Sequence, residues 1–527
     1  LIRLPSAATF TLPSRKRGRG CVLANLHTPL SPLSRGESKK IEIPIHRFMS
    51  CRLRRLFFGA SIFFVLPVVG CSTTSVFTSY TSKMNPLIDG LTTRQFDHSL
   101  KVLNKYRKSS DKILYLLERS RIAQIKNDID SSMKDFEAAI AAVRQMEEKA
   151  VISASDIGAQ TASFLANDNT IPYKGDGYEK VFMYQFQAFN YLAKKDIEGA
   201  GVEVRRANRE QELALEIHEK ELARAEEKAR DKKIDTQQAY NNLNSAYQGM
   251  DDIAGKVKNS FQNAYTFYMS GIVYELLNQP NDAYIDYKKA LQIFPDNAYL
   301  QRDVMRLAKD LEMNQEYEDY ASRFGSMPIK DDEGAGNGKT GELVVFFENG
   351  LAPQKREIQI PIPTPNGILA IAFPIYHTKW SGVEPLSLSE SAGSSSLGTT
   401  ESICYAQALA VKSLKEKVPV MVIRHIIRAA AKAAIQLKAK DSAGSLGQIF
   451  SSIYNVVSER ADVRSWLTLP RDVQIMRIRL PEGVHRLHLA HKASGASSDI
   501  DVSINQNKTL LRVIRIRSEL YTTSITF

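Results

Sequence analysis

The residues most suggestive of chemistry in this sequence are Gly70 and Cys71, a small residue followed by a thiol after an apolar run. The chemistry they suggest is cleavage of the bond between them, because a processing site needs a small residue there and a permanent anchor does not. Residues 49–55 are basic, and residues 56–69 form an apolar run of 14 residues. As a helix this run would rise about 21 Å, short of the roughly 30 Å hydrocarbon core of a bilayer, so it suits a signal peptide. A short signal anchor that stays in the bilayer is the alternative.

The order of basic residues, apolar residues and a Val-Val-Gly-Cys ending resembles a bacterial lipoprotein signal peptide, here residues 49–70. The resemblance implies that Cys71 is acylated and becomes the first residue of the mature protein, and two or more acyl chains give stable anchoring. Ser72 at the next position implies sorting to the outer membrane, so we expect a lipid-anchored protein of the cell envelope that faces the periplasm. We interpret residues 1–48 as an upstream or extended leader without order. Their Arg/Ser-rich composition also resembles an organellar transit peptide, which leaves the Val-Val-Gly-Cys ending unexplained.

The basic character of the chain is confined to this leader. Residues 1–70 contain 12 Lys and Arg but only two acids, which accounts for +10 of the formal charge of +12. From Cys71 onward 58 basic and 56 acidic residues nearly balance, so we expect no nucleic-acid partner. Only Cys71 and Cys404 would remain after cleavage, which excludes a disulfide framework within one chain, and the apolar neighbours of Cys404 predict a buried thiol.

Other candidate chemical groups do not form a recognisable site. His485, His488 and His491 are spaced like metal ligands but fall in a predicted strand, where alternate residues face opposite sides. Three such ligands cannot converge on one zinc ion. The sequence has no H-E-x-x-H, G-x-S-x-G or G-x-G-x-x-G motif, and Glu333 stands where a phosphate-binding loop at 333–340 requires glycine. We therefore expect no enzyme activity, no metal and no cofactor.

A helical domain is predicted at 91–324, where apolar residues recur at intervals of three and four. Its clearest segment, 267–295, resembles a tetratricopeptide repeat. Small residues let two antiparallel helices approach, aromatic residues fill the space between them, and a proline ends the second helix. The residues that match the motif are Phe267, Gly271, Tyr274, Ala283, Tyr287, Ala290 and Pro295.

The same register recurs upstream, and Ala139 and Ala207 lie 68 residues apart, twice the period of 34. Stacked helix pairs are therefore expected, with a generic helical bundle as the alternative. Residues 203–232, rich in Glu, Lys, Arg and Ala, predict a long solvated helix, which we interpret as a protruding arm rather than half of a coiled coil. The upstream matches are Tyr184, Ala188, Tyr191, Ala200, Val204 and Ala207, with a looser copy at Leu116, Ser120, Ala123, Ser132, Phe136 and Ala139.

The predicted fold class is α+β and multidomain, with an all-α tetratricopeptide-like region followed by a smaller α+β domain containing an antiparallel sheet or sandwich. Residues 387–400 read as a loop, and two amphipathic helices, 420–437 and 446–457, are expected to cover the sheet, with a membrane-surface hairpin as the alternative. The remaining boundaries are a tether at 71–90, a flexible linker at 325–341 and the second domain at 342–527. Strands are expected at 343–347, 358–362, 368–376, 473–480, 484–490, 499–505 and 510–517.

The layout as a whole resembles an uncharacterised family of bacterial tetratricopeptide-repeat-containing lipoproteins. Two segments outside the repeats contribute to the resemblance, Tyr173–Glu179 and Ala461–Pro470. The resemblance implies a protein-protein interaction scaffold whose stacked pairs form a concave binding surface for partners of unknown identity. The alternatives are an envelope hydrolase with its site in 342–527 and an accessory activator of cell-wall synthesis.

Overall fold

The helices of the chain form antiparallel pairs, and every pair is closed by the same kind of turn. In each turn one residue has φ between 55° and 64°, and the amide of the next residue donates to a carbonyl five residues earlier at 2.7–2.9 Å. This is the Schellman arrangement that ends a helix with a left-handed residue. The left-handed residues are Arg94, Asn127, Lys195, Asn278 and Glu312, spaced by 33, 68, 83 and 34 residues.

These turns therefore define five helix pairs, two more than the sequence pattern singled out, and the spacings of 33, 68 and 34 follow one period or two. The computed structural model describes residues 80–153, 171–231, 237–325, 339–364, 367–391, 396–428, 431 and 460–527. The paired helices are α1 (Tyr80–Thr92) with α2 (Phe96–Leu103), α3 (Lys112–Ile125) with α4 (Ile129–Ser153), α6 (Gly177–Ala193) with α7 (Ile197–Asp231), α10 (Ala264–Leu276) with α11 (Pro280–Ile293), and α12 (Ala298–Asp310) with α13 (Asn314–Phe324). Between α7 and α10 lie α8 (Gln237–Tyr247) and α9 (Asp251–Ala254).

The second half of the chain forms a five-stranded sheet, a four-stranded sheet and a two-stranded hairpin. The large sheet has the order β11-β10-β1-β7-β6, the smaller one β5-β4-β8-β9, and β2 pairs with β3. Their strands are β1 (Thr340–Asn349), β2 (Lys355–Thr364), β3 (Gly367–Tyr376), β4 (Ser387–Ser389), β5 (Ser396–Thr399), β6 (Glu401–Cys404), β7 (Asp472–Pro481), β8 (Gly483–His491), β9 (Ala496–Ile504), β10 (Lys508–Ile516) and β11 (Glu519–Thr526).

The predicted α+β class is confirmed, with one refinement to the sheet. β1 runs parallel to β10, with Val344 opposite Leu510, whereas its other neighbour, β7, is antiparallel. The large sheet is therefore mixed, because the chain returns to the side of β1 only after β7, β8 and β9 have formed. Strand β11 had no counterpart among the predicted strands, and the predicted loop at 387–400 contains β4 and β5.

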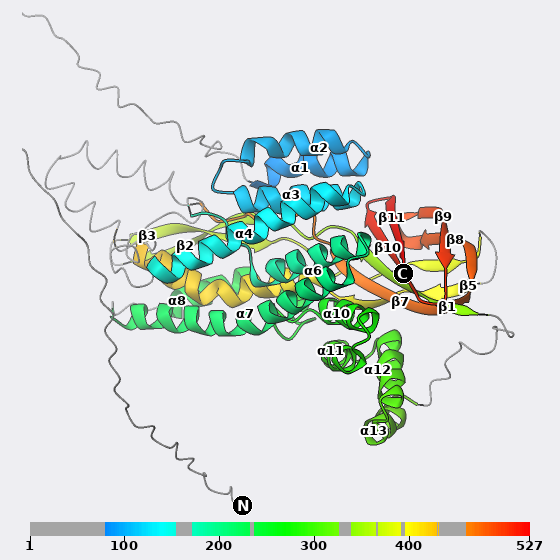
Figure 1. Cartoon of the computed structure of the whole chain (residues 1–527). Coiled ribbons are helices and arrows are strands. Elements are labelled where there is room, and N and C mark those ends of the chain that lie inside the picture. Colours follow the sequence, from blue (N-terminus) through cyan, green and yellow to red (C-terminus); the bar gives the residue numbers. More distant parts are fainter. Residues whose placement is uncertain are drawn as a thin grey trace, which may run out of the picture. The chain divides into compact units, whose positions relative to one another are not determined.

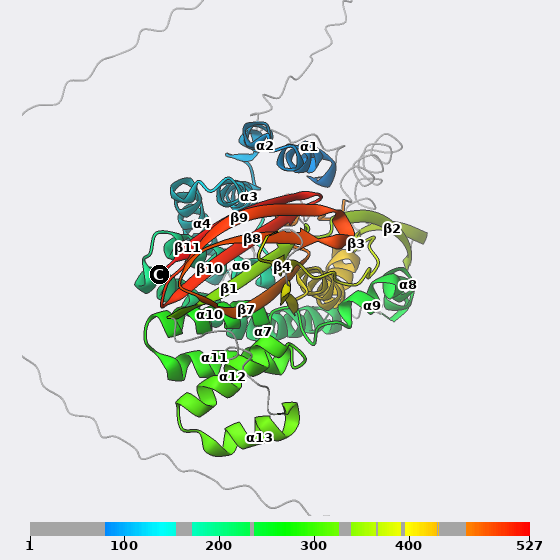
Figure 2. The same ribbon diagram turned by 90° about the vertical axis from the view of Figure 1, so that its right-hand side faces the viewer.

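The large sheet is covered on both faces. Phe346 in β1 faces the helices, and its neighbour Phe347 faces the small sheet, where its ring lies 5.7 Å from that of His491. Because both faces are buried, the run Leu343–Phe347 is continuously apolar instead of alternating. The helix pairs curve around one side of this sheet, with α1–α3 at one end of the arc and α10–α13 at the other (Figure 2).

The long helix α7 is not the free arm that the sequence predicted. Helix 406–428 runs beside it (Figure 1), and Ala225 and Ala229 of α7 pack against Ile423 and Ile427 of that helix. The small alanine side chains permit this close contact, which was not recognisable from the charged composition of α7. Helix 406–428 also reaches the two-stranded sheet, since the rings of His425 and Phe373 lie 4.8 Å apart. The second predicted helix, 446–457, lies outside the described residues.

The helical region begins earlier than the predicted boundary. α1 starts at Tyr80, inside the segment 71–90 interpreted as a tether, and its Met84, Leu87 and Leu91 are buried. Of the predicted linker 325–341, only Gly325 and the residues from 339 onward are described, and β1 already begins at Thr340. The helices and both sheets belong to one compact unit.

Candidate functional site

The residues predicted to form the repeat core lie inside the helix pairs, and Gly271 shows why its type matters. A Cβ atom added there would lie 2.3 Å from the Tyr287 ring, so only glycine permits the approach of α10 to α11. Gly70, Cys71 and the rest of the leader lie outside the described residues. Of the other core positions, Tyr191 and Pro295 are partly exposed, and Tyr184, Ala188, Ala200, Ala207, Phe267, Tyr274, Ala283, Tyr287 and Ala290 are buried.

The inner face of the helical arc, which we expected to bind a partner, is covered by the chain's own sheet. The Phe346 ring lies 5.7 Å from Phe189 of α6, 5.6 Å from Tyr265 of α10 and 6.2 Å from Tyr268 of α10. Such ring contacts supply much of the packing energy of a core. Strand β1 thus occupies the position at which an extended ligand would lie in an open arc.

A dry charge cluster, formed by Arg121, Glu348 and Arg512, fastens this strand to α3. Glu348 accepts hydrogen bonds from Arg121 and, at 2.7 Å, from Arg512 Nε, and all three side chains are at most 5% exposed. Burial alone would raise the pKa of Glu348, but the two guanidinium groups outweigh it and hold the pKa below its usual value. Both arginines also lie over aromatic rings, at 4.2 Å for Phe186 and 4.4 Å for Phe189.

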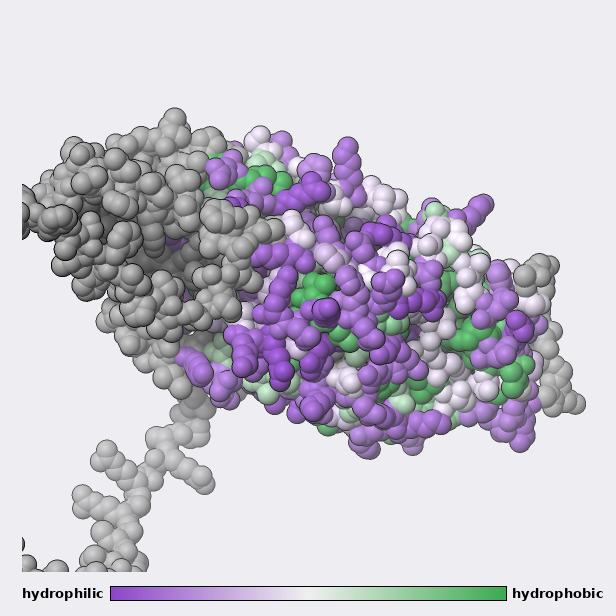
Figure 3. Space-filling view, turned by 90° about the horizontal axis from the view of Figure 1, so that it is seen from above, coloured by the Kyte–Doolittle hydropathy of each residue, from purple (hydrophilic) through white to green (hydrophobic). Residues whose placement is uncertain are grey.

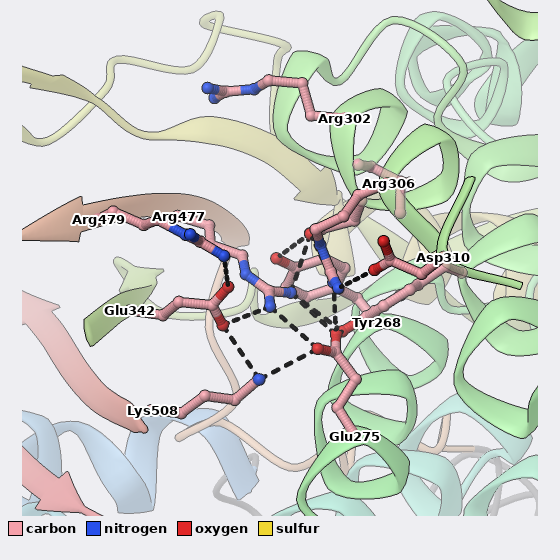
Figure 4. Close-up of polar contacts among 12 residues, drawn as sticks. Tyr268, Glu275, Arg302, Arg306, Asp310, Glu342, Arg477, Arg479 and Lys508 are labelled. Carbon is pink, nitrogen blue, oxygen red and sulfur yellow. Dashed lines mark hydrogen bonds and ion pairs between the residues drawn. The ribbon is translucent and has the colours of Figure 1, made fainter. Parts of the chain in front are cut away.

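A second group of charges, the cleft network, joins α10 and α12 to β1, β7 and β10 (Figure 4). Its centre is Arg477, which donates to Glu275 at 3.0 and 3.1 Å and to Glu342 at 2.6 Å, and forms an ion pair with Asp303 at 2.9 Å. Lys508 lies between Glu275 and Glu342, at 3.1 and 3.0 Å. Burial would raise the pKa of Glu342, but Arg477 and Lys508 overcome it and lower the pKa to about 2.

A cleft of about 280 Å³ opens beside this network, between α12 and β7. None of these charged residues was identified from the sequence. One usable signal was present, because Glu348, Arg477 and Arg479 stand within otherwise apolar strand segments, where a charge is rarely buried unless it is paired. The lining residues are Tyr299, Arg302, Asp303, Arg306, Lys309, Asp310, Glu342, Arg477, Ile478 and Arg479.

The two segments that carry the family resemblance, Tyr173–Glu179 and Ala461–Pro470, meet in the structure. Glu179 accepts a hydrogen bond from the backbone amide of Trp466 at 2.8 Å and another from the Tyr173 hydroxyl. Glu118 of α3 accepts from the next two backbone amides, Leu467 at 2.7 Å and Thr468 at 3.2 Å. Buried carboxylates thus satisfy the backbone of an irregular segment, which explains why these residues occur together.

A smaller pocket of about 170 Å³ lies beside these segments. Its buried Asp176 contacts Lys417 and lies 3.6 Å from Lys355. Burial would raise the pKa of Asp176, but the two lysines dominate and hold it far below its usual range. The Lys355 amine in turn donates to the Arg464 carbonyl at 3.2 Å. These charges are already neutralised by each other, so the arrangement is that of a structural clasp.

The largest groove, of about 600 Å³, lies on the outer side of the arc between α7 and α11. Its apolar residues are Leu213, Tyr274 and Ile285, and Ile285 remains 50% exposed. Charges of both signs surround them, so the groove has no single electrostatic preference. The charged residues are Arg205, Arg209, Lys289, Glu212, Glu216, Asp282 and Asp286.

The candidate ligands of the sequence analysis are dispersed. His485 contacts Glu390 at 3.1 Å, His488 contacts Asp499 at 2.7 Å, and His491 lies against Phe347. Within the part of the chain that the structure describes, no group of three potential ligands could hold a metal ion. Cys404 is buried, and burial raises the pKa of its thiol far above the usual value.

The described surface is largely hydrophilic on the face seen in Figure 3, and apolar residues form small separate patches there. No helix among the described residues has the length and apolar character needed to cross a bilayer.

No protein-family model and no curated protein matches the chain. Two solved structures are distantly similar to it. One is described as the MamA protein, with 12% identity, a TM-score of 0.25, and coverage of 46% of this chain and 88% of that one. The other is the TPR2AB domain of yeast Sti1 in a pHSP90 complex, with 13% identity, a TM-score of 0.18 and the same coverage.

Proposed function

We propose that the protein is a lipid-anchored scaffold that binds a protein partner through the groove between α7 and α11. The observation that carries this proposal is the contrast between the two sides of the arc. The inner side is filled by β1 through Phe346, whereas the outer groove leaves Ile285 half exposed beside Leu213 and Tyr274. The partner surface is thus moved from the inner face to the outer one.

The chemistry of the groove suits an amphipathic helical segment of the partner. Such segments bury an apolar stripe in a groove and place their charges at its edges. The floor of Leu213, Tyr274 and Ile285 would receive the stripe, and the edge charges of both signs would pair with it. This mode of binding uses no catalytic residue, and we propose no enzyme activity.

Cys71 supplies the anchor in this proposal, and the periplasmic side of the outer membrane is the proposed location. We expect Cys71→Ser to move the protein from the membrane fraction to the soluble fraction and to abolish incorporation of labelled fatty acid. A membrane fraction that does not change, together with undiminished acyl labelling, would overturn the anchor. This test leaves the groove untouched, so anchoring and partner binding are examined separately.

Partner binding is tested by site-specific photo-crosslinking in envelope extracts, with the crosslinker at position 285 or at position 484. Val484 is the matched control because it is an exposed aliphatic residue, 73% accessible, on the distant strand β8. We expect one envelope protein to be captured from position 285 only, and Ile285→Glu to abolish its binding when both proteins are purified. Equal capture from both positions would contradict the proposal. If the captured protein is a cell-wall synthase, the scaffold is an accessory activator of cell-wall synthesis.

A further inference from the structure

We propose that the cleft between α12 and β7 is a binding site for a phosphate-bearing anion. The cleft has a volume of about 280 Å³ and is lined by Arg302, Arg306, Lys309, Arg477 and Arg479. Figure 4 shows the side chains that border it, with Arg302 coming from the helix and Arg479 from the strand.

The inner part of the site is electrostatically satisfied and rigid. Arg477 is held by Glu275, Glu342 and Asp303, and its side chain is 7% exposed. Arg306 is held by Glu275 at 3.0 Å and Asp303 at 3.3 Å. The Tyr268 hydroxyl also donates to Asp303 at 2.8 Å, so the carboxylates of this part have their acceptor oxygens engaged. A preorganised base of this kind lets a ligand bind without the cost of ordering the site.

The outer part of the site has unneutralised positive charge. Arg302 donates only to the Ala298 carbonyl, at 3.4 Å, and lies 4.6 Å from the Tyr299 ring. Among the described residues, neither Arg302 nor Lys309 forms an ion pair with a carboxylate. Arg479 lies 3.7 Å from Glu342, but its side chain is 43% exposed and Glu342 is already shared with Arg477 and Lys508.

The balance of charge favours a phosphate over a carboxylate. Six cationic groups border the cleft and its network, against four carboxylates, which leaves a surplus of two positive charges that matches a phosphate monoester dianion. Guanidinium groups also present a planar fork of donors that fits phosphate oxygens. The cations are Arg302, Arg306, Lys309, Arg477, Arg479 and Lys508, and the carboxylates are Glu275, Asp303, Asp310 and Glu342.

The same phosphate chemistry has two sources, a free organic phosphate or a phospholipid headgroup, and the experiment separates them. Equilibrium dialysis of the purified full chain carrying Cys71→Ser would measure binding of glycerol 3-phosphate and of acetate at fixed ionic strength. Co-sedimentation with phosphatidylcholine vesicles, with and without phosphatidylglycerol, would measure headgroup binding without the lipid anchor. The test variant combines R302Q, K309Q and R479Q. The control combines K101Q, R107Q and R486Q, which removes the same net charge from exposed positions elsewhere.

We expect saturable binding of one of the two phosphate probes, weakened at least tenfold in the test variant and less than twofold in the control. Acetate should bind at least tenfold more weakly than glycerol 3-phosphate. Saturation by glycerol 3-phosphate indicates a free ligand, and enrichment on phosphatidylglycerol vesicles alone indicates a headgroup. Should the test variant fail to fold, R302K with R479K retains the charge and should retain binding within about threefold, whereas R479E should abolish it. Equal weakening in test and control variants, or no saturable binding of either probe, would overturn the proposal.

Discussion

The dry charge cluster and the cleft network both fasten the helical arc to the sheet, but they differ in their access to solvent. In the dry cluster, Glu348 lies between Arg121 and Arg512, and all three side chains are almost completely buried. In the cleft network, Arg477 and its carboxylates border a cleft in which Arg479 is 43% exposed. The same residue types thus occur once in a packed core and once at its edge.

The difference shows how the use of a buried charge depends on its surroundings. The dry cluster must satisfy its charges internally, and Gln124 Oε1 accepts from both Arg121 and Arg512 at 3.1 Å to help do so. The cleft network meets solvent at Arg302 and Lys309, where additional positive charge is tolerated because water screens it. We therefore infer a purely structural role for the first and a capacity for ligand binding only for the second.

The largest effect is expected in the dry cluster. Glu348→Gln removes the one negative charge between two buried arginines, and an uncompensated buried charge costs about 3–5 kcal/mol of unfolding free energy. Chemical denaturation followed by circular dichroism would measure it. The control is Glu519→Gln, which removes a pair with Arg94 whose side chains are 57% and 33% exposed, and which should cost less than about 1 kcal/mol. Similar losses for the two variants would refute the distinction between buried and exposed pairs.

A substitution within one helix pair should have the next largest effect. Gly271→Ala would place a methyl group 2.3 Å from the Tyr287 ring, and such overpacking costs up to about 3 kcal/mol, despite the better helix propensity of alanine. Gly249→Ala is the control, because no atom lies within 4 Å of the added Cβ there. Thermal unfolding of both variants would compare them, and an unchanged midpoint for Gly271→Ala would show that α10 and α11 can move apart freely.

The fold class and the helix pairing could be predicted because they depend on local patterns. Small residues at 271, 283 and 290 and the period of 34 report the contact between neighbouring helices, which is set within one stretch of sequence. The position of Gly271 against Tyr287 follows directly from that pattern. Strands such as 473–480 were recognisable for the same reason, from their own composition and turns.

The occupation of the inner face could not be predicted, because it depends on pairing over long sequence distances. Arg121 and Glu348 are separated by 227 positions, and Glu275 and Arg477 by 202. Each residue alone has the composition of a solvated surface position, and only the closed fold makes it a buried partner. The covering of α7 by helix 406–428 escaped prediction similarly, since Ala225 and Ala229 resemble ordinary residues of a solvated helix.

A smaller and pH-dependent effect is expected in the cleft network. Because the pKa of Glu342 is lowered to about 2 in the folded protein, this carboxylate adds stability above pH 4.5 that is lost as the pH falls toward 2. Glu342→Gln should therefore cost about 2 kcal/mol at pH 7, less than Glu348→Gln, because Glu275 and solvent still compensate Arg477. The difference in unfolding free energy between wild type and variant should shrink from pH 5 to pH 3, as measured by urea titration at each pH. A difference independent of pH would mean that Glu342 acts through packing alone.

The smallest effect on stability, and the sharpest test of the two sides of the arc, is expected at Ile285. Its side chain is half exposed, so Ile285→Ser should change the unfolding free energy by no more than about 0.5 kcal/mol. On the inner face, Phe346→Ala should cost about 3–5 kcal/mol, because that ring is completely buried among aromatic neighbours. Partner capture should show the opposite order, with Ile285→Ser losing the partner in a fully folded protein. A folded Ile285→Ser variant that captures the partner as well as wild type does would place the interaction surface elsewhere, because the inner face is already occupied by β1.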